Sequence, residues 1–181
     1  LQHDWYAVTG DTPGPRSGFA WLVVSLAQWI GLKPAAFLLA ALGNIGVILV
    51  SLVAAQKWFK KPSAGVVAAL LVTTAHTYGL GWTDVLVRAQ LLPSGLSLPL
   101  ALAALGAGLS GRVFLSSGAA IAASFLHPTL GLETGAVALF VAVVSGRASV
   151  RQAAQAGVLL VFCLGAWLWV LPAPQLSGAE F

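Results

Sequence analysis

Long runs of Ala, Leu, Val, Phe and Gly with very few charged residues constrain this chain more than any other feature of its sequence. Of its 181 residues, 59% are hydrophobic and only 8% are charged, whereas globular domains carry roughly 25% charged residues. A soluble domain of this size could not bury so much apolar surface, so we expect lipid to act as its solvent. The sequence therefore predicts an all-α, polytopic bundle of transmembrane helices.

Six membrane helices are predicted, because the fourth of five apolar segments continues past His127-Pro128 into a further apolar run. Their ranges are 35–56, 64–82, 96–110, 113–126, 129–145 and 154–171. An α-helix rises 1.5 Å per residue, so runs of about 14 to 17 residues cover about 21–25 Å of a roughly 30 Å hydrocarbon core. Several of the predicted helices are therefore short for a membrane span.

The basic residues predict how the bundle is oriented. Six of them follow the first, third and fifth predicted spans: Lys57, Lys60, Lys61, Arg112, Arg147 and Arg151. Alternating spans place these loops on one side, which the positive-inside rule identifies as cytoplasmic. The other side receives the remaining basic residues and all five acids: Arg16, Lys33, Arg88, Asp4, Asp11, Asp84, Glu133 and Glu180.

Segment 17–32 is predicted to be an amphipathic helix on the outer surface rather than a seventh span. Its apolar residues recur at helical spacing: Phe19, Leu22, Val23, Leu26 and Ile30. If this segment crossed the bilayer, the three lysines after the first span would move to the outer face. We expect Lys33-Pro34 to begin the first span. The predicted organisation is an external loop and interfacial helix (1–33), a bundle (34–172) and an external tail (173–181).

The stretch SFLHPTLGLETG, residues 124–135, places ionisable groups between two apolar runs. A residue before proline favours extended backbone, so one helix should end at His127 and the next should begin at Pro128. Counting from the basic loops places His127, Glu133 and His76 about 20–22 Å along their helices, beneath the outer boundary. Ionisable groups at that depth face protein or a hydrated cavity, so we expect a polar pocket open to the outside.

Simpler roles are open for each of these residues. His127 could cap the preceding helix, Glu133 could interact with a helix dipole, and His76 could bond to a neighbouring helix. Asp84 and Arg88 are one helical turn apart and could pair with each other. The sequence contains no phosphate-binding loop, HExxH motif, zinc-type Cys/His spacing or nucleophile elbow.

The order of several short motifs resembles bacterial multi-pass proteins related to the GT-C class of glycosyltransferases. An external loop with Asp4 and Pro15-Arg16 precedes RAQLLPSGLSLPLALAAL (88–105), an SGR turn (110–112) and SFLHPTLGLETG. Enzymes of this class use polyprenyl-linked sugars at the outer membrane face. The resemblance implies Asp4 as catalytic base or contact to a divalent metal, with Arg88 and His127 holding a polyprenyl diphosphate. Asp84, His76 and Glu133 are the further candidates for substrate binding.

The chain also departs from that class. The resemblance leads us to expect a membrane helix before the first external loop, which these 181 residues do not include, and the HDWY stretch (3–6) has one acid where many of these enzymes have two. The chain starts at Leu1 and contains no methionine, so we expect it to be part of a longer polypeptide. The resemblance implies a bacterial inner-membrane protein with residues 1–33 on the non-cytoplasmic side.

Two main hypotheses follow for the function. The first is a fragment of a GT-C-like transferase with a polar site on the non-cytoplasmic side. The second is a non-enzymatic accessory subunit of a larger membrane complex, packed through Gly- and Ala-rich helix faces. A transporter, suggested by the helix break, ranks third because no inverted repeat is evident. The expected partners are membrane lipids and other membrane subunits, and not nucleic acid.

Overall fold

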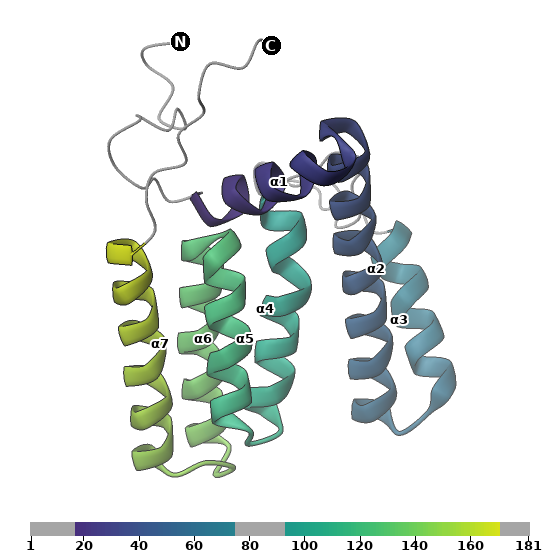
Figure 1. Ribbon diagram of the computed structural model, residues 1–181. Helices are drawn as coiled ribbons and strands as arrows, with labels where there is room; N and C mark the ends of the chain where they lie inside the picture. The colour runs from purple at the N-terminus through teal and green to yellow at the C-terminus, as the bar shows by residue number, and fades with distance from the viewer. Residues whose placement is uncertain (1–16, 75–92, 171–181) are drawn as a thin grey trace, which may run out of the picture.

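The computed structural model describes residues 17–74 and 93–170, and within these ranges it contains seven helices and no strand (Figure 1). The all-α prediction is confirmed. The helices are α1 (Ser17–Ile30), α2 (Leu32–Phe59), α3 (Pro62–Thr74), α4 (Pro93–Leu109), α5 (Val113–Leu126), α6 (Pro128–Val144) and α7 (Val150–Val170). Each predicted apolar segment overlaps one of these helices, and the bounds of α5 agree residue for residue.

Helices α2 to α7 run side by side, and α1 lies across one end of them (Figure 1). Helix α4 is central, because it packs against α2, α5 and α6. Helix α7 contacts α5 and α6 on one flank, and α3 contacts α2 on the other. Consecutive helices alternate in direction, so the turns α2–α3, α4–α5 and α6–α7 all lie at the end opposite α1.

The corner between α1 and α2 is formed by Gly31, whose φ of 85° is readily accessible only to glycine. The second helix begins at Leu32, slightly before the predicted start at Lys33-Pro34. Helix α1 is amphipathic, as expected. Its inward side chains cover a cluster at the ends of α2, α4 and α5, formed by Leu39, Leu96 and Leu126 with Phe19, Leu22, Val23 and Leu26. Ile30 was expected on this face, but it is 43% exposed because the helix ends at the corner.

Small residues occupy most of the buried positions inside the bundle. The fully buried positions of α4 to α7 are mainly alanines and serines, including Ala104, Ala120, Ala123, Ala142 and Ala156. A Cβ added to Gly108 of α4 would lie 2.6 Å from the carbonyl oxygen of Ala138 in α6. The helix backbones therefore approach closely, as in many membrane-helix pairs.

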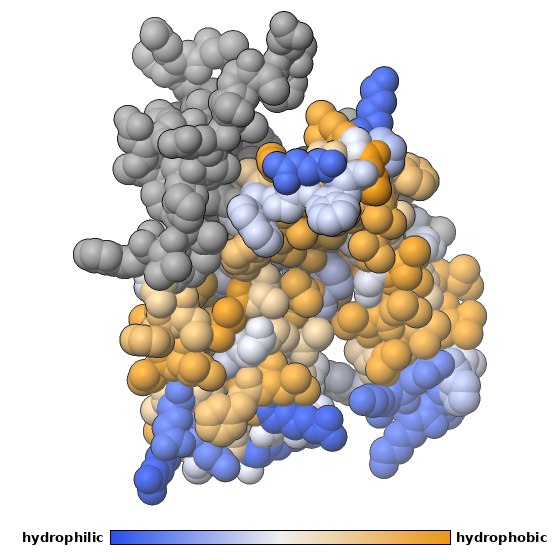
Figure 2. Space-filling model, viewed as in Figure 1, coloured by the Kyte–Doolittle hydropathy of each residue, from blue (hydrophilic) through white to orange (hydrophobic). Residues whose placement is uncertain are grey.

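Large apolar side chains point outward instead. Phe37, Leu70, Phe114, Phe140 and Phe162 are each more than half exposed, and the outer surface of the helices is hydrophobic (Figure 2). Among the described helices, α2 is the one long and apolar enough to cross a membrane by length and composition. The other six are shorter apolar helices. Apolar surface on this scale marks a contact with lipid or with another protein.

Candidate functional site

His127 stands at the junction of α5 and α6, where the sequence predicted a break. Its backbone is extended, with φ −149° and ψ 92°, because the following proline disfavours helical geometry. The backbone N–H of His127 donates to the carbonyl oxygen of Ala123 at 2.8 Å and so closes α5. The imidazole Nδ1 accepts from the backbone N–H of Leu130 at 3.4 Å and lies 3.1 Å from Thr129 Oγ1. The backbone of His127 thus caps α5, and its ring caps α6.

This cap constrains the imidazole chemically. A ring nitrogen that accepts a hydrogen bond must keep its lone pair, so this arrangement fits the tautomer with its proton on Nε2. The ring is half-buried. The simpler role, a structural cap, is therefore realised at both helices: the backbone N–H of His127 bonds a carbonyl of α5, as expected, and its ring caps α6.

Glu133 lies on a different face of α6. The buried face of this helix includes Gly131, Thr134 and Gly135, whereas Glu133 is exposed beside Leu132 and Val137. The six residues from His127 to Glu133 correspond to about 9 Å of rise and about 240° of rotation around the helix. The two groups therefore occupy the same end of the bundle but not the same face of α6. Glu133 also lies beyond the first turn, where a helix dipole has little effect.

The other predicted site residues lie outside the described residues: Asp4, His76, Asp84 and Arg88. Their proposed roles remain predictions. Within residues 17–74 and 93–170, no group of three or more His, Cys, Asp and Glu side chains could hold a metal ion.

Sequence analysis did not single out a group of buried serines between α4, α5 and α6. Ser116 Oγ donates to the carbonyl oxygen of Ala104 at 2.8 Å, and Ser97 Oγ donates to that of Ala123 at 3.0 Å. Both bonds join α4 to α5. Ser117 and Ser124 are equally buried, but within the described structure their hydroxyl groups have no hydrogen-bond partner. The signal that could have identified them in the sequence is serine recurring at helical spacing within an otherwise apolar helix.

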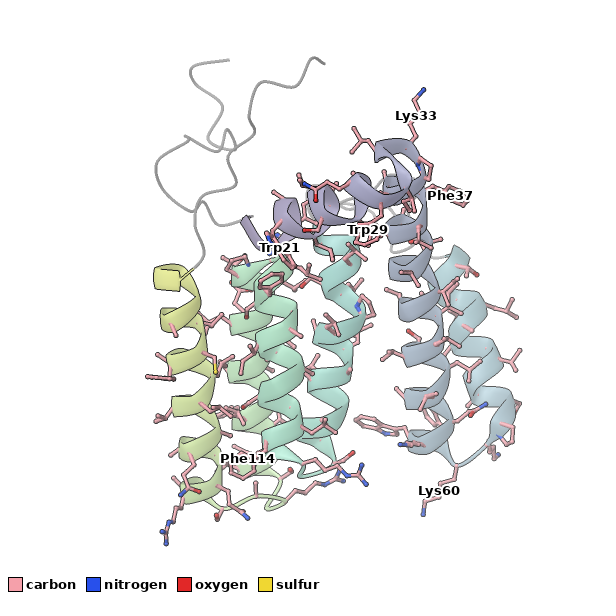
Figure 3. The ribbon with its side chains drawn as sticks, viewed as in Figure 1. Trp21, Trp29, Lys33, Phe37, Lys60 and Phe114 are labelled. Carbon is pink, nitrogen blue, oxygen red and sulfur yellow. The ribbon has the colours of Figure 1, made fainter. Side chains whose placement is uncertain are left out.

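The basic residues gather at the end opposite α1. Figure 2 shows hydrophilic side chains concentrated there, and Figure 3 shows Lys60 at that end and Lys33 at the other. Two of the basic turns are joined, because Arg147 Nη1 donates to the carbonyl oxygen of Leu109, the last residue of α4. Segments 57–61, 110–112 and 145–151 contain six basic residues and no acidic one.

Comparison with known proteins finds no matching family model, no similar curated protein and no similar solved structure. Two features of the described residues bear on function: large apolar side chains face outward, and six of the seven described basic side chains lie in or next to the turns at one end of the bundle, with Lys33 at the other.

Proposed function

We propose that the chain is an integral membrane protein in which α2 to α7 span the bilayer and α1 lies on its non-cytoplasmic surface. The exposed phenylalanines and leucines of α2, α3, α5, α6 and α7 support this arrangement, because water is a poor solvent for them. The three basic turns at one end support a cytoplasmic location for that end. Trp21 and Trp29 are exposed on α1, where amphipathic rings suit a membrane interface.

Single-cysteine labelling tests this topology. In a Cys163→Ala background, cysteines replacing Ser110 and Ser145 report on the basic end, and a cysteine replacing Gln28 reports on α1; all three original side chains are exposed. A membrane-impermeant maleimide should label the Gln28 position in intact spheroplasts, and the other two positions only after the membrane is opened. Equal labelling of all three positions in intact cells would rule out the topology.

We further propose that this bundle is the membrane part of a GT-C-like glycosyltransferase that takes its sugar from a polyprenyl phosphate carrier. The observation that supports the proposal is that two helix starts, each close in the sequence to a predicted site residue, lie at the α1 end of the bundle. Helices α4 and α6 both begin there, beneath α1. Arg88 precedes the start of α4 by five residues, and His127 immediately precedes α6. Asp4 precedes α1 in the sequence.

The chemistry assigned to these residues follows from their types. Asp4 would act as the general base toward the acceptor, and Arg88 would neutralise the departing phosphate through its paired N–H donors. His127 and Glu133 would shape the pocket, with Asp84 and His76 as further contacts. Stabilisation of charge on the leaving phosphate would be the main contribution to catalysis. A divalent metal would need at least some of its ligands from residues outside the described ranges.

Transfer of a radiolabelled sugar from polyprenyl phosphate in membranes tests the enzymatic proposal. Asp4→Asn and Arg88→Ala should each abolish transfer, while Asp11→Asn, a change of the same kind in the same N-terminal stretch, should leave it unchanged. Equal expression of the variants in the membrane is the control for folding. Retained transfer in both Asp4→Asn and Arg88→Ala would refute the enzymatic proposal.

An accessory subunit of a larger membrane complex is the second candidate. It is favoured by the positions of His127 and Glu133, which do not share a face of α6, and by the exposed apolar face of α7, which includes Val158 and Phe162. If this candidate is correct, gentle solubilisation should yield the chain in a stoichiometric assembly with another membrane protein. Isolation as a stable monomer without a partner would argue against it.

A further inference from the structure

Helices α2 and α4 are in contact near α1 and separate toward the basic end. The buried residues of α2 are Ala35, Leu39, Gly43 and Val47, all in the first sixteen residues of the helix. Val47 is 1% exposed, whereas none of the twelve residues of α2 after it, all of them described, is buried. Ala54 and Trp58 continue the same helical face at spacings of seven and eleven residues from Val47. Both are exposed, and Trp58 is 66% exposed.

The facing side of α4 shows the same change. Gly95 and Pro99 meet α2, because Cβ atoms added to Gly43 and Gly46 would lie within 3.0 Å of them. Gly106 follows Pro99 by seven residues, which returns to the same face of the helix two turns further along. A Cβ added to Gly106 would meet no atom within 4 Å. The space that a side chain at Gly106 would occupy is therefore open, and Figure 2 shows the surface hollowed between the two groups of helices.

The rims of this α2–α4 groove carry positive charge. Lys57 lies in the last turn of α2, followed by Lys60 and Lys61 in the turn to α3. Arg112 follows α4 and precedes α5. All four side chains are exposed, and hydrophilic residues stand at the open end of the groove on both sides (Figure 2). Four cations around one opening favour an anionic occupant.

The length of the groove indicates what kind of occupant it takes. From Val47 to Phe59 α2 rises about 18 Å, which is close to one leaflet of a roughly 30 Å hydrocarbon core. Above Val47 the Gly43–Gly95 contact closes the groove, so a helix that crosses the membrane cannot pass along it. An acyl chain entering from the basic side needs only the depth of one leaflet. The phosphate of the lipid that carries this acyl chain would then lie at the level of the lysines.

We propose that the α2–α4 groove binds an anionic phospholipid of the cytoplasmic leaflet. The acyl chain lies between Trp58 and Ala54 on one wall and Gly106 on the other, and the phosphate lies between Lys57, Lys60 or Lys61 and Arg112. Basic residues near a membrane surface attract anionic headgroups. The proposal rests on the membrane-spanning arrangement proposed above and is independent of transferase activity.

Native mass spectrometry of the full chain, released from a neutral detergent, measures how tightly lipids are retained. Phosphatidylglycerol and phosphatidylcholine with identical acyl chains are the probes. We expect one phosphatidylglycerol to be bound at least tenfold more tightly than phosphatidylcholine. Gly106→Leu should fill the groove and weaken phosphatidylglycerol binding at least fivefold. Gly118→Leu is the matched control, because a Cβ at Gly118 on the exposed face of α5 also meets no atom within 4 Å.

Variants of the basic residues test separately whether these residues bind the lipid headgroup. Lys61→Gln combined with Arg112→Gln should remove the preference for phosphatidylglycerol while retaining the weaker binding of phosphatidylcholine. Arg151→Gln, at the same end but on α7, should leave the preference unchanged. Circular dichroism shows whether each variant is folded.

Three results would overturn the proposal. They are equal affinity for the two lipids, equal effects of Gly106→Leu and Gly118→Leu, and a dimer or partner complex that Gly106→Leu dissociates. The last would assign the groove to a protein segment. Because these measurements need no sugar substrate, a failed transferase assay would leave them unaffected.

Discussion

The carbonyl oxygen of Gly95 in α4 lies 2.8 Å from the position that a Cβ on Gly43 of α2 would occupy. The next turn repeats the arrangement, because a Cβ on Gly46 would lie 2.9 Å from the Cβ of Pro99. The α2–α4 contact therefore depends on the absence of side chains from one helix only.

We expect Gly43→Ala to lower the free energy of unfolding by about 1–2 kcal/mol, because overpacking typically costs about 1–3 kcal/mol and the helix gains up to about 1 kcal/mol from alanine. Gly95→Ala should instead raise stability by up to about 1 kcal/mol, since its Cβ would meet no atom within 4 Å. Thermal unfolding in detergent measures both. Similar shifts in the two variants would show that the helices do not cross at these glycines.

Adjacent serines in α5 provide a second matched pair. Ser116 and Ser117 are both fully buried, but only the hydroxyl group of Ser116 has a hydrogen-bond partner among the described residues. Ser116→Ala should destabilise the bundle by about 0.5–1.5 kcal/mol, in the range of interhelical hydrogen bonds between membrane helices. Ser117→Ala should be neutral or stabilising, because it removes an unsatisfied polar group from the interior. Chemical denaturation in mixed micelles would distinguish them, and an equal loss in both variants would contradict this assignment.

Features that depend on local chemistry could be predicted from the sequence. Long apolar runs require helices whatever their neighbours, and proline after His127 ends α5 at the expected residue. The periodicity of Phe19, Leu22 and Leu26 identified the face of α1 that covers the bundle. The alternation of basic turns likewise follows from the number of helices between them.

Features that depend on pairing between helices could not be predicted. Nothing in a single sequence distinguishes Ser116 from Ser117, or Gly43 from Gly106, because the difference is made by the helix opposite. The proposed pocket could not be predicted reliably for the same reason, because side chains at equal depth along two helices need not lie on facing surfaces. Glu133 is at the expected end of α6 but points to another side of the helix than His127.

The cap formed by His127 leads to a third prediction. His127→Ala should cost about 1 kcal/mol of stability, because the backbone N–H of Leu130 loses its acceptor. His127→Asn should recover most of that loss, since an asparagine oxygen can also accept from the first turn when it stands just before a helix, at the N-cap. Differential scanning fluorimetry in detergent is a suitable measurement. If asparagine were as damaging as alanine, the capping role of the ring would be wrong.

The same pair of variants separates capping from substrate binding. If His127 only caps α6, sugar transfer by the asparagine variant should match that of the original chain at temperatures where both are folded. If the imidazole also holds a phosphate, His127→Asn should be stable but impaired in substrate binding, seen as a raised KM. The first outcome would remove His127 from the proposed site.

Arg147 links two turns at the basic end and gives a fourth prediction. Its guanidinium donates to the carbonyl oxygen of Leu109, one of the carbonyls left without a partner at the C-terminus of α4. A cation there also interacts favourably with the helix dipole. Since the side chain is exposed, the combined effect should be modest. We expect Arg147→Ala to lower the free energy of unfolding by about 1 kcal/mol.

Arg151→Ala is the control, because Arg151 is also exposed and carries the same charge at the same end, in the first turn of α7. It should change stability by less than about 0.5 kcal/mol. Arg147→Lys should give an intermediate loss, since lysine keeps the charge but lacks the planar fork of N–H donors. Raising the salt concentration should reduce the part of the effect that comes from charge and leave the hydrogen bond. If Arg147→Ala and Arg151→Ala were equally destabilising, net charge at this end, rather than the bond to Leu109, would set the stability of the α4–α5 and α6–α7 turns.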